Sequence, residues 1–130
     1  MLDQFMPPGY LVHNGRVYRR LETEVDTAQG PKVIEEHDLV CATELLVMGA
    51  SQDYEGARFS VQVRDGLAQF RSYTLPISVL TANRADGDFE NTLAEIGLSA
   101  APRVAEKLRM YLVDCVHMYA VRATRHRLVS

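Results

Sequence analysis

The sequence has very little lysine and no clustered glycines, and these shortages exclude the common phosphate-binding loops. Lys32 and Lys107 are the only two lysines among 130 residues, and neither follows a glycine. A P-loop needs a Gly-Lys-Ser/Thr run, and the dinucleotide-binding motif needs three glycines within six residues. The closest two glycines, Gly9 and Gly15, are six positions apart. The chain therefore has no glycine-rich cradle for a nucleotide phosphate, and it also lacks the GxSxG nucleophile motif.

The sequence also lacks a signal peptide, a membrane-spanning run and the cysteine content of a secreted scaffold. The opening MLDQFMPPGY has neither a basic n-region nor an apolar h-region. The longest apolar run, Leu45–Ala50, is too short to cross a bilayer. Cys41 and Cys115 are the only two cysteines, and both lie among apolar residues. We therefore expect a cytoplasmic protein with reduced thiols and no membrane partner.

Charge is distributed unevenly along the chain. The whole chain carries a formal charge of −3, but residues 1–99 carry −7 and residues 100–130 carry +4. This asymmetry indicates an anionic partner at the basic end. The alternative is a solvated helix face whose arginines pair with the chain's own acids. If the chain contacts nucleic acid, we expect the contacts to come from Arg103, Lys107, Arg109, Arg122, Arg125 and Arg127.

The first half of the chain has the pattern of β-strands. Asn14–Gly15 is typical of a type I′ turn and separates two β-prone runs, Tyr10–His13 and Arg16–Leu21. The polar stretch over residues 23–36 contains a Gly-Pro pair, so we expect a loop there. A long β-capable run follows over residues 38–50.

The clearest strand signal lies on the two sides of Asp65–Gly66. Before this pair, Phe59, Val61 and Val63 alternate with polar residues. After it the alternation is weaker, and we expect one face to hold Ala68, Phe70 and Ser72. Period-2 alternation around Asp-Gly predicts an antiparallel hairpin. With the runs above, this gives one antiparallel sheet of about five strands.

The last third of the chain changes to the helical period. We expect Asp88 to cap a short helix that ends at Gly97, and Ser99 to cap a second helix. The apolar face of the second helix is expected to hold Val104, Leu108, Leu112, Cys115 and Tyr119. Strands followed by helices predict an α+β fold. We expect a single α+β domain over residues 1–119 and a basic tail or interdomain linker over residues 120–130.

No metal or cofactor site is expected from these residues. The possible ligands are His37, Cys41, Cys115 and His117. On a strand the first two would share a face, but on a helix the last two point about 200° apart. None of the usual zinc-ligand spacings is present.

Two further patterns are open to a functional and to a structural interpretation. Glu35, Glu36 and Asp38 flank His37, a composition that suits acid–base chemistry but also suits a solvated loop. The expected connection Ile96–Ser99 between the helices resembles a helix-turn-helix elbow, although helical hairpins that only cover a sheet are more common. We expect no catalytic residue in the chain and interpret it as not an enzyme.

Three segments together resemble one known family. GYLVHNGRVYRR, VCATELLVMGASQDYEGARFSVQVRDGLAQFRSYTLP and DFENTLAEIGLSAAPRVAEKLRMYL occur in the order seen in Domain of Unknown Function 927, and they cover roughly residues 8–119. The resemblance depends on the order of hairpins, turns and a helix that ends in Gly-Leu. Family members often carry a tryptophan before the Asp-Gly turn, where this chain has Gln62 and Val63.

The resemblance implies a role in a longer protein. Such domains are similar to the front portion of helicase-like P-loop ATPases of phages, plasmids and integrated elements, so VRATRHRLVS looks like the point where the chain leads into an ATPase domain. The expected function is a non-catalytic accessory module that positions DNA or the motor domain, with DNA as a weak, non-specific partner. The alternative is a protein-interaction or oligomerisation module that uses an exposed sheet edge and makes no nucleic-acid contact. The family gives no catalytic residue to carry over.

Overall fold

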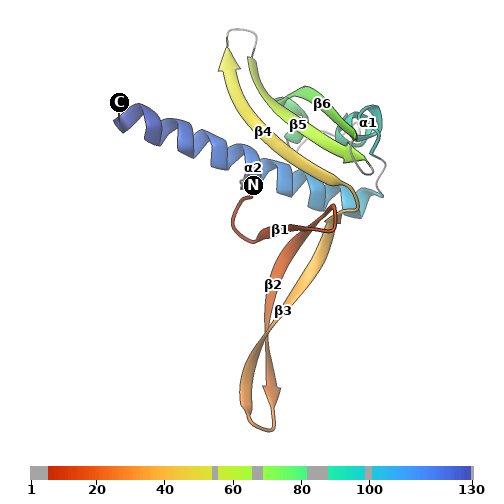
Figure 1. The fold of residues 1–130 in the computed structure, drawn as a ribbon, viewed down its shortest axis with the longest axis vertical. Coiled ribbons are helices and arrows are strands. Elements are labelled where there is room, and N and C mark those ends of the chain that lie inside the picture. The colour runs from red at the N-terminus through yellow and green to blue at the C-terminus, as the bar shows by residue number, and fades with distance from the viewer. Residues whose placement is uncertain (1–5, 54–55, 66–68, 82–87, 99–100, 130) are drawn as a thin grey trace.

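Six strands form two separate antiparallel sheets, and two C-terminal helices pack against them (Figure 1). The computed structural model describes residues 6–53, 56–65, 69–81, 88–98 and 101–129. The predicted α+β class is confirmed. The prediction of one sheet of about five strands is wrong, since each sheet has three strands.

The first sheet has the order β1-β2-β3, with β1 at Tyr10–His13, β2 at Arg16–Thr27 and β3 at Gly30–Cys41. The turn between β1 and β2 confirms the Asn-Gly prediction. Asn14 and Gly15 have φ angles of 52° and 73°, the left-handed conformation that a type I′ turn requires at both positions.

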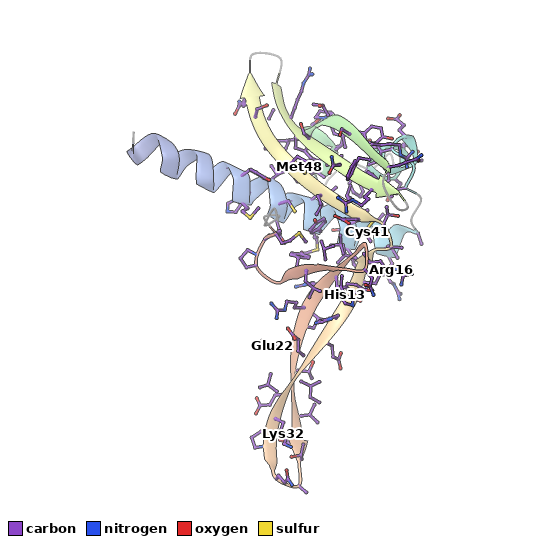
Figure 2. The ribbon with its side chains drawn as sticks, in the orientation of Figure 1. His13, Arg16, Glu22, Lys32, Cys41 and Met48 are labelled. Carbon is purple, nitrogen blue, oxygen red and sulfur yellow. The ribbon has the colours of Figure 1, made fainter. Side chains whose placement is uncertain are left out.

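Residues 23–36, which we expected to form a loop, instead continue β2 and β3 as a long hairpin. We call residues 21–36 the arm. The arm extends away from α2 and from the second sheet (Figure 1), and Figure 2 shows Glu22 and Lys32 along it. The sequence did not show these strands because the residues of the arm are almost all exposed, so no buried face imposes an apolar alternation.

The second sheet has the order β4-β5-β6, with β4 at Glu44–Asp53, β5 at Gly56–Asp65 and β6 at Gln69–Pro76. The β-capable run over residues 38–50 is thus not one strand. It breaks at residues 42–43, and its two halves belong to different sheets. The predicted hairpin on the two sides of Asp-Gly is confirmed by the β5–β6 pairing, although residues 66–68 of its turn lie outside the described residues.

The face that we predicted for β6 is wrong. Tyr73 pairs with Val61 and Leu75 packs on the core, whereas Phe70 is 51% exposed. Phe70 lies opposite Arg64, whose guanidinium carbon is 4.6 Å from the centre of the phenyl ring. This cation–π contact gives an outward-facing aromatic residue a partner, which hydrophobic alternation alone does not reveal.

A 3₁₀ turn, η1 (Ile77–Leu80), leads from the second sheet to helix α1 (Asp88–Glu95). The predicted end of α1 is confirmed. Gly97 has a φ of 83°, and the Leu98 amide donates a 2.7 Å hydrogen bond to the Leu93 carbonyl, as in a Schellman motif. The caps predicted at Asp88 and Ser99 depend on side chains outside the described residues.

Helix α2 (Pro102–Val129) is continuous for 28 residues and lies across both sheets (Figure 1). Leu108, Leu112 and Cys115 are buried as predicted, but Val104 is 40% exposed in the first turn of the helix. Ala105 is buried in place of Val104. The most buried residue of the helix is Tyr111, which the sequence analysis did not assign to the core.

A single core connects the two sheets and the helices. Its largest fully buried members include Tyr111, Phe59, Leu45, Leu93 and Leu112. These residues come from β4, β5, α1 and α2, while Val17 and Val40 contribute the inner face of the first sheet. Since α2 contacts both sheets, burial of its apolar face holds them together.

We expect Leu112→Ala to lower the free energy of unfolding by about 2–5 kcal/mol, because the change leaves a cavity in a closely packed core. Val104→Ala, on the same helix but at an exposed position, should cost less than about 1 kcal/mol. Urea denaturation followed by circular dichroism measures both variants. Equal costs would show that the buried face of α2 is assigned wrongly.

Candidate functional site

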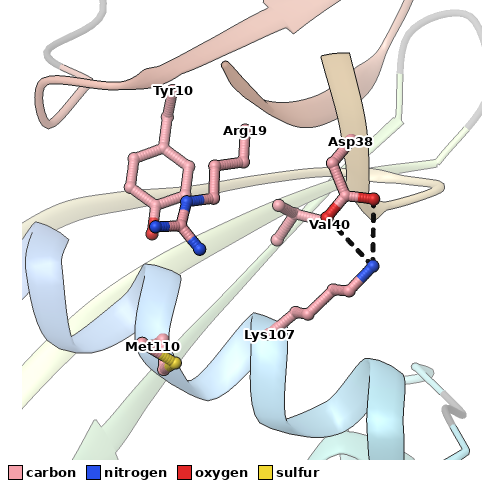
Figure 3. A pocket seen from close by; sticks show the side chains of 6 residues that line it. All are labelled: Tyr10, Arg19, Asp38, Val40, Lys107 and Met110. Carbon is pink, nitrogen blue, oxygen red and sulfur yellow. Dashed lines mark hydrogen bonds and ion pairs between the residues drawn. The ribbon is translucent and has the colours of Figure 1, made fainter. Parts of the chain in front are cut away.

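The strongest concentration of polar contacts lies where α2 crosses the base of the first sheet. A cavity of about 30 Å³, large enough for one water molecule, is lined by Tyr10, Arg19, Asp38, Val40, Lys107 and Met110 (Figure 3). The register of the sheet explains this grouping. Tyr10 pairs with Arg19, and Arg19 pairs with Asp38, so the three side chains form one row on the face toward α2.

Lys107 joins α2 to β3 in this row. Its Nζ atom lies 3.0 Å from both carboxylate oxygens of Asp38 (Figure 3). The Lys107 and Asp38 side chains are 40% and 35% exposed, so solvent screens the pair and its contribution to stability is small. We expected Lys107 to be available to DNA and Asp38 to belong to a solvated acidic cluster. Each instead has the other as its partner.

Arg109 joins α2 to η1. Its Nη1 atom donates a 3.0 Å hydrogen bond to the Leu80 carbonyl, and its Nε and Nη2 atoms contact the carboxylate of Glu106. Only 17% of the Arg109 side chain is exposed. The hydrogen bonds from Arg109 lower the pKa of Glu106 below its usual value. Arg109 therefore has a structural role, although the sequence placed it on an exposed basic face.

The remaining four basic residues of this set fall into two groups. Arg103 is exposed and forms no ion pair with any described residue. Arg122, Arg125 and Arg127 lie on the last ten residues of α2, where the backbone is helical and the side chains are outside the described residues. Two of the six predicted residues are thus internal partners, Arg103 is exposed, and the side chains of the other three lie outside the described residues.

Three tyrosine hydroxyls reinforce the junction between α2 and the sheets. Tyr111 donates a 2.8 Å hydrogen bond to the Leu45 carbonyl, and Tyr119 donates a 3.0 Å bond to the Val47 carbonyl. Tyr10 donates to Asp114 Oδ2 at 2.9 Å. The sequence analysis gave these hydroxyls no role. The four-residue spacing of Tyr111, Cys115 and Tyr119 was the available signal, because it places all three on one helix face.

The acidic cluster beside His37 does not converge on one point. Glu35 accepts a 2.6 Å hydrogen bond from Arg20 Nε, which lowers the pKa of that carboxyl, and its other oxygen lies 3.7 Å from His37 Nε2. Glu36 projects from the opposite face of the hairpin, since neighbouring residues of a strand alternate. With Asp38 paired to Lys107, no shared acid–base centre forms here.

The four possible metal ligands are also separated. A bulge at Val40 reverses the face of β3, so His37 pairs with Arg20 while Cys41 pairs with Val17 on the buried side. Our expectation that His37 and Cys41 would share a face is therefore wrong. Burial raises the pKa of the Cys115 thiol to about 12, and His117 is exposed. Within the described residues, no three His, Cys, Asp or Glu side chains are grouped to hold a metal ion.

Comparisons of the chain with protein-family models, curated proteins and solved structures gave no match. The resemblance to Domain of Unknown Function 927 therefore stays a prediction. No helix among the described residues combines the length and apolar character needed to cross a membrane.

We expect the protein to lose stability as the pH rises from about 10 to about 12, in part because of Tyr10. Burial and the hydrogen bond to Asp114 raise the pKa of Tyr10 from 10.0 to about 12. The folded state therefore keeps a proton that the unfolded chain loses in this range. The stabilising contribution is complete below pH 10 and disappears as the pH approaches 12.

Urea denaturation of the wild type and of Tyr10→Phe at a series of alkaline pH values measures this effect. The variant should show a shallower fall in unfolding free energy over that range. Parallel pH dependences for the two proteins would contradict the assignment to Tyr10.

Proposed function

We propose that this chain is a non-catalytic accessory module of a helicase-like DNA-replication ATPase of mobile elements, and that it positions the motor domain of the same polypeptide. The order of hairpins, turns and helices over residues 8–119, which resembles Domain of Unknown Function 927, supports this proposal. The proposal assigns no reaction and no cofactor to the chain itself.

Helix α2 is the observation that carries the proposal. Its first part is fixed to both sheets by a buried apolar face, by Tyr111 and by Tyr119. Its last ten residues, 120–129, continue as regular helix past the sheets (Figure 1); we call them the outer part of α2. At 1.5 Å per residue the whole helix is about 42 Å long. A helix anchored in this way suits the task of holding a neighbouring domain at a fixed distance.

The contacts of the basic residues favour the motor domain over DNA as the principal partner. Lys107 and Arg109 are occupied by Asp38, Glu106 and the Leu80 carbonyl. If DNA is a second partner, it has Arg103, Arg122, Arg125 and Arg127 to bind to. With so few phosphate contacts, the dissociation constant should be no tighter than about 10⁻⁶ M at physiological salt.

The arm favours a second candidate function, a protein-interaction or oligomerisation module with no nucleic-acid contact. The arm carries five acidic residues and one lysine, so it repels DNA. Its strand edges also pair with no further strand among the residues that the structure describes, and other proteins commonly dock on such edges. The two candidate functions differ in whether the outer part of α2 contacts nucleic acid.

A helix-breaking substitution in the full-length polypeptide tests the proposed role of α2. Thr124→Pro should interrupt the helix beyond the core, while Thr124→Ala preserves it. We expect ATP hydrolysis by the motor to persist in both variants and ATP-driven strand separation to fall several-fold only in the proline variant. Equal strand separation by the two variants, or a full-length polypeptide without a GxxxxGK[ST] motif, would contradict the proposal.

A DNA titration separates the two candidate functions. We expect residues 1–130 to bind short duplex and single-stranded DNA weakly at low ionic strength, and to lose this binding steeply as salt is added, because neutralised phosphates release counterions. Replacing Arg122, Arg125 and Arg127 by alanine should remove most of the binding, because only Arg103 of the four candidate contacts then remains. Replacing Lys107 by alanine should leave most of it. A flat titration of the wild type would exclude DNA and favour the interaction module.

A further inference from the structure

The arm has more negative charge than its own structure neutralises. Residues 21–36 include five carboxylates and one lysine, a net charge of −4. Glu35 is paired with Arg20. Within the described part of the chain, no ion pair or hydrogen bond neutralises the exposed carboxylates of Glu22, Glu24, Asp26 and Glu36.

These carboxylates do not help the arm to fold. Glu22 lies directly opposite Glu35 in the register of the hairpin, and like charges at facing positions destabilise a strand pair. The arm is two-stranded beyond Arg19, where its pairing with β1 ends. A two-stranded hairpin without a packed face is only marginally stable in water. We therefore expect the arm to become more stable when a partner covers its surface.

The arm also offers apolar contacts and free backbone. Val25 and Ile34 are exposed on one face, and Val33 is 66% exposed on the other. With the strand order β1-β2-β3, no other described strand pairs with the outer edge of β3. An unpaired edge beside exposed β-branched residues is a surface on which another protein can dock.

Charge of the opposite sign is present in the last part of the same chain. Residues 100–130 carry a charge of +4, which opposes the charge of the arm. The outer part of α2 holds Arg122, Arg125 and Arg127, and Val113 is exposed just before it. The arm strand from Leu21 to Thr27 spans roughly 23 Å at 3.3 Å per residue, and the ten-residue outer part of α2 spans about 15 Å. The arm strand is thus long enough to cover the whole outer part of α2.

The two surfaces of one copy do not meet. The arm leaves the body at its base, where Lys107 pairs with Asp38, and then runs away from α2 (Figure 1). The outer part of α2 extends past the second sheet in another direction. Contact between the acidic and the basic surface therefore requires a second molecule.

We infer that the arm of one copy docks on the outer part of α2 of a second copy, with the arm's carboxylates against the basic helix. The inference rests on the second candidate function and deepens it, because it names a second copy of the chain as the partner of the arm, independent of any motor domain. The contact is electrostatic in large part, so self-association should be strong at low ionic strength and weaken when salt is added.

A charge-exchange experiment on residues 1–130 tests this inference by sedimentation velocity. In the first variant, the charge of the arm is reversed by Glu22→Lys, Glu24→Lys and Asp26→Lys. In the second variant, the charge of the outer part of α2 is reversed by Arg122→Glu, Arg125→Glu and Arg127→Glu. Each variant alone should stay monomeric, since its arm and helix then carry the same sign. An equimolar mixture should associate, because each arm then faces a helix of opposite charge.

Variants with neutral side chains keep the test decisive if a charge-reversed variant folds poorly. Replacing the three arm carboxylates by Gln, Gln and Asn, or the three arginines by Gln, should reduce self-association several-fold without a change in circular dichroism. The inference is overturned if the wild type is monomeric at low salt, or if the neutral variants associate as strongly as the wild type. It is also overturned if the mixture of the two charge-reversed variants stays monomeric although both are folded. Association of the wild type that is insensitive to salt would also overturn it.

Discussion

The structure depends on the burial of one helix face against two sheets that do not pair with each other. The chain passes from β3 to β4 through residues 42–43. Among the described residues no strand of one sheet pairs with a strand of the other, so no continuous ladder of hydrogen bonds holds the sheets in place. The apolar face of α2 lies over both sheets, with Leu112 and Cys115 buried at its centre. Burial of each large side chain contributes on the order of 1.5–3 kcal/mol before entropy is subtracted.

Hydrogen bonds then fix the direction in which α2 crosses the sheets. The hydroxyls of Tyr111 and Tyr119 bond to carbonyls of β4, and Tyr10 reaches from β1 to Asp114 on the helix. Lys107 and Arg109 add contacts to β3 and η1. Because hydrogen bonds are directional and apolar burial is not, these polar residues set the orientation of α2. The direction of its outer part follows from that orientation.

Two parts of the molecule lie beyond this packed body, and they carry opposite charge. The arm is acidic, and the outer part of α2 holds three arginines. No residue of the arm belongs to the buried core of the described residues, so the packing of the body places little constraint on the sequence of the arm. Charge that folding does not require is a reasonable sign of contacts made with other molecules. The proposed function uses the outer part of α2 as a spacer to the motor domain. The proposed self-association pairs the arm of one copy with the outer part of α2 of another.

The sequence by itself determined the elements whose signals are local. The Asn14–Gly15 turn, the alternation of Phe59, Val61 and Val63, and the Schellman end of α1 at Gly97 each follow from a few neighbouring residues. These features depend on allowed backbone angles and on side-chain period, which a short stretch of sequence specifies. The α+β class followed from their order.

Only the tertiary structure decided which residues meet across the chain. The arm was hidden because strands exposed on both faces need no alternation, and the bulge at Val40 moved His37 and Cys41 to opposite faces. The pairing of Lys107 with Asp38, 69 positions away, made a candidate DNA contact into an internal one. Such contacts depend on distances between elements far apart in sequence, and periodicity within one element carries no information about them.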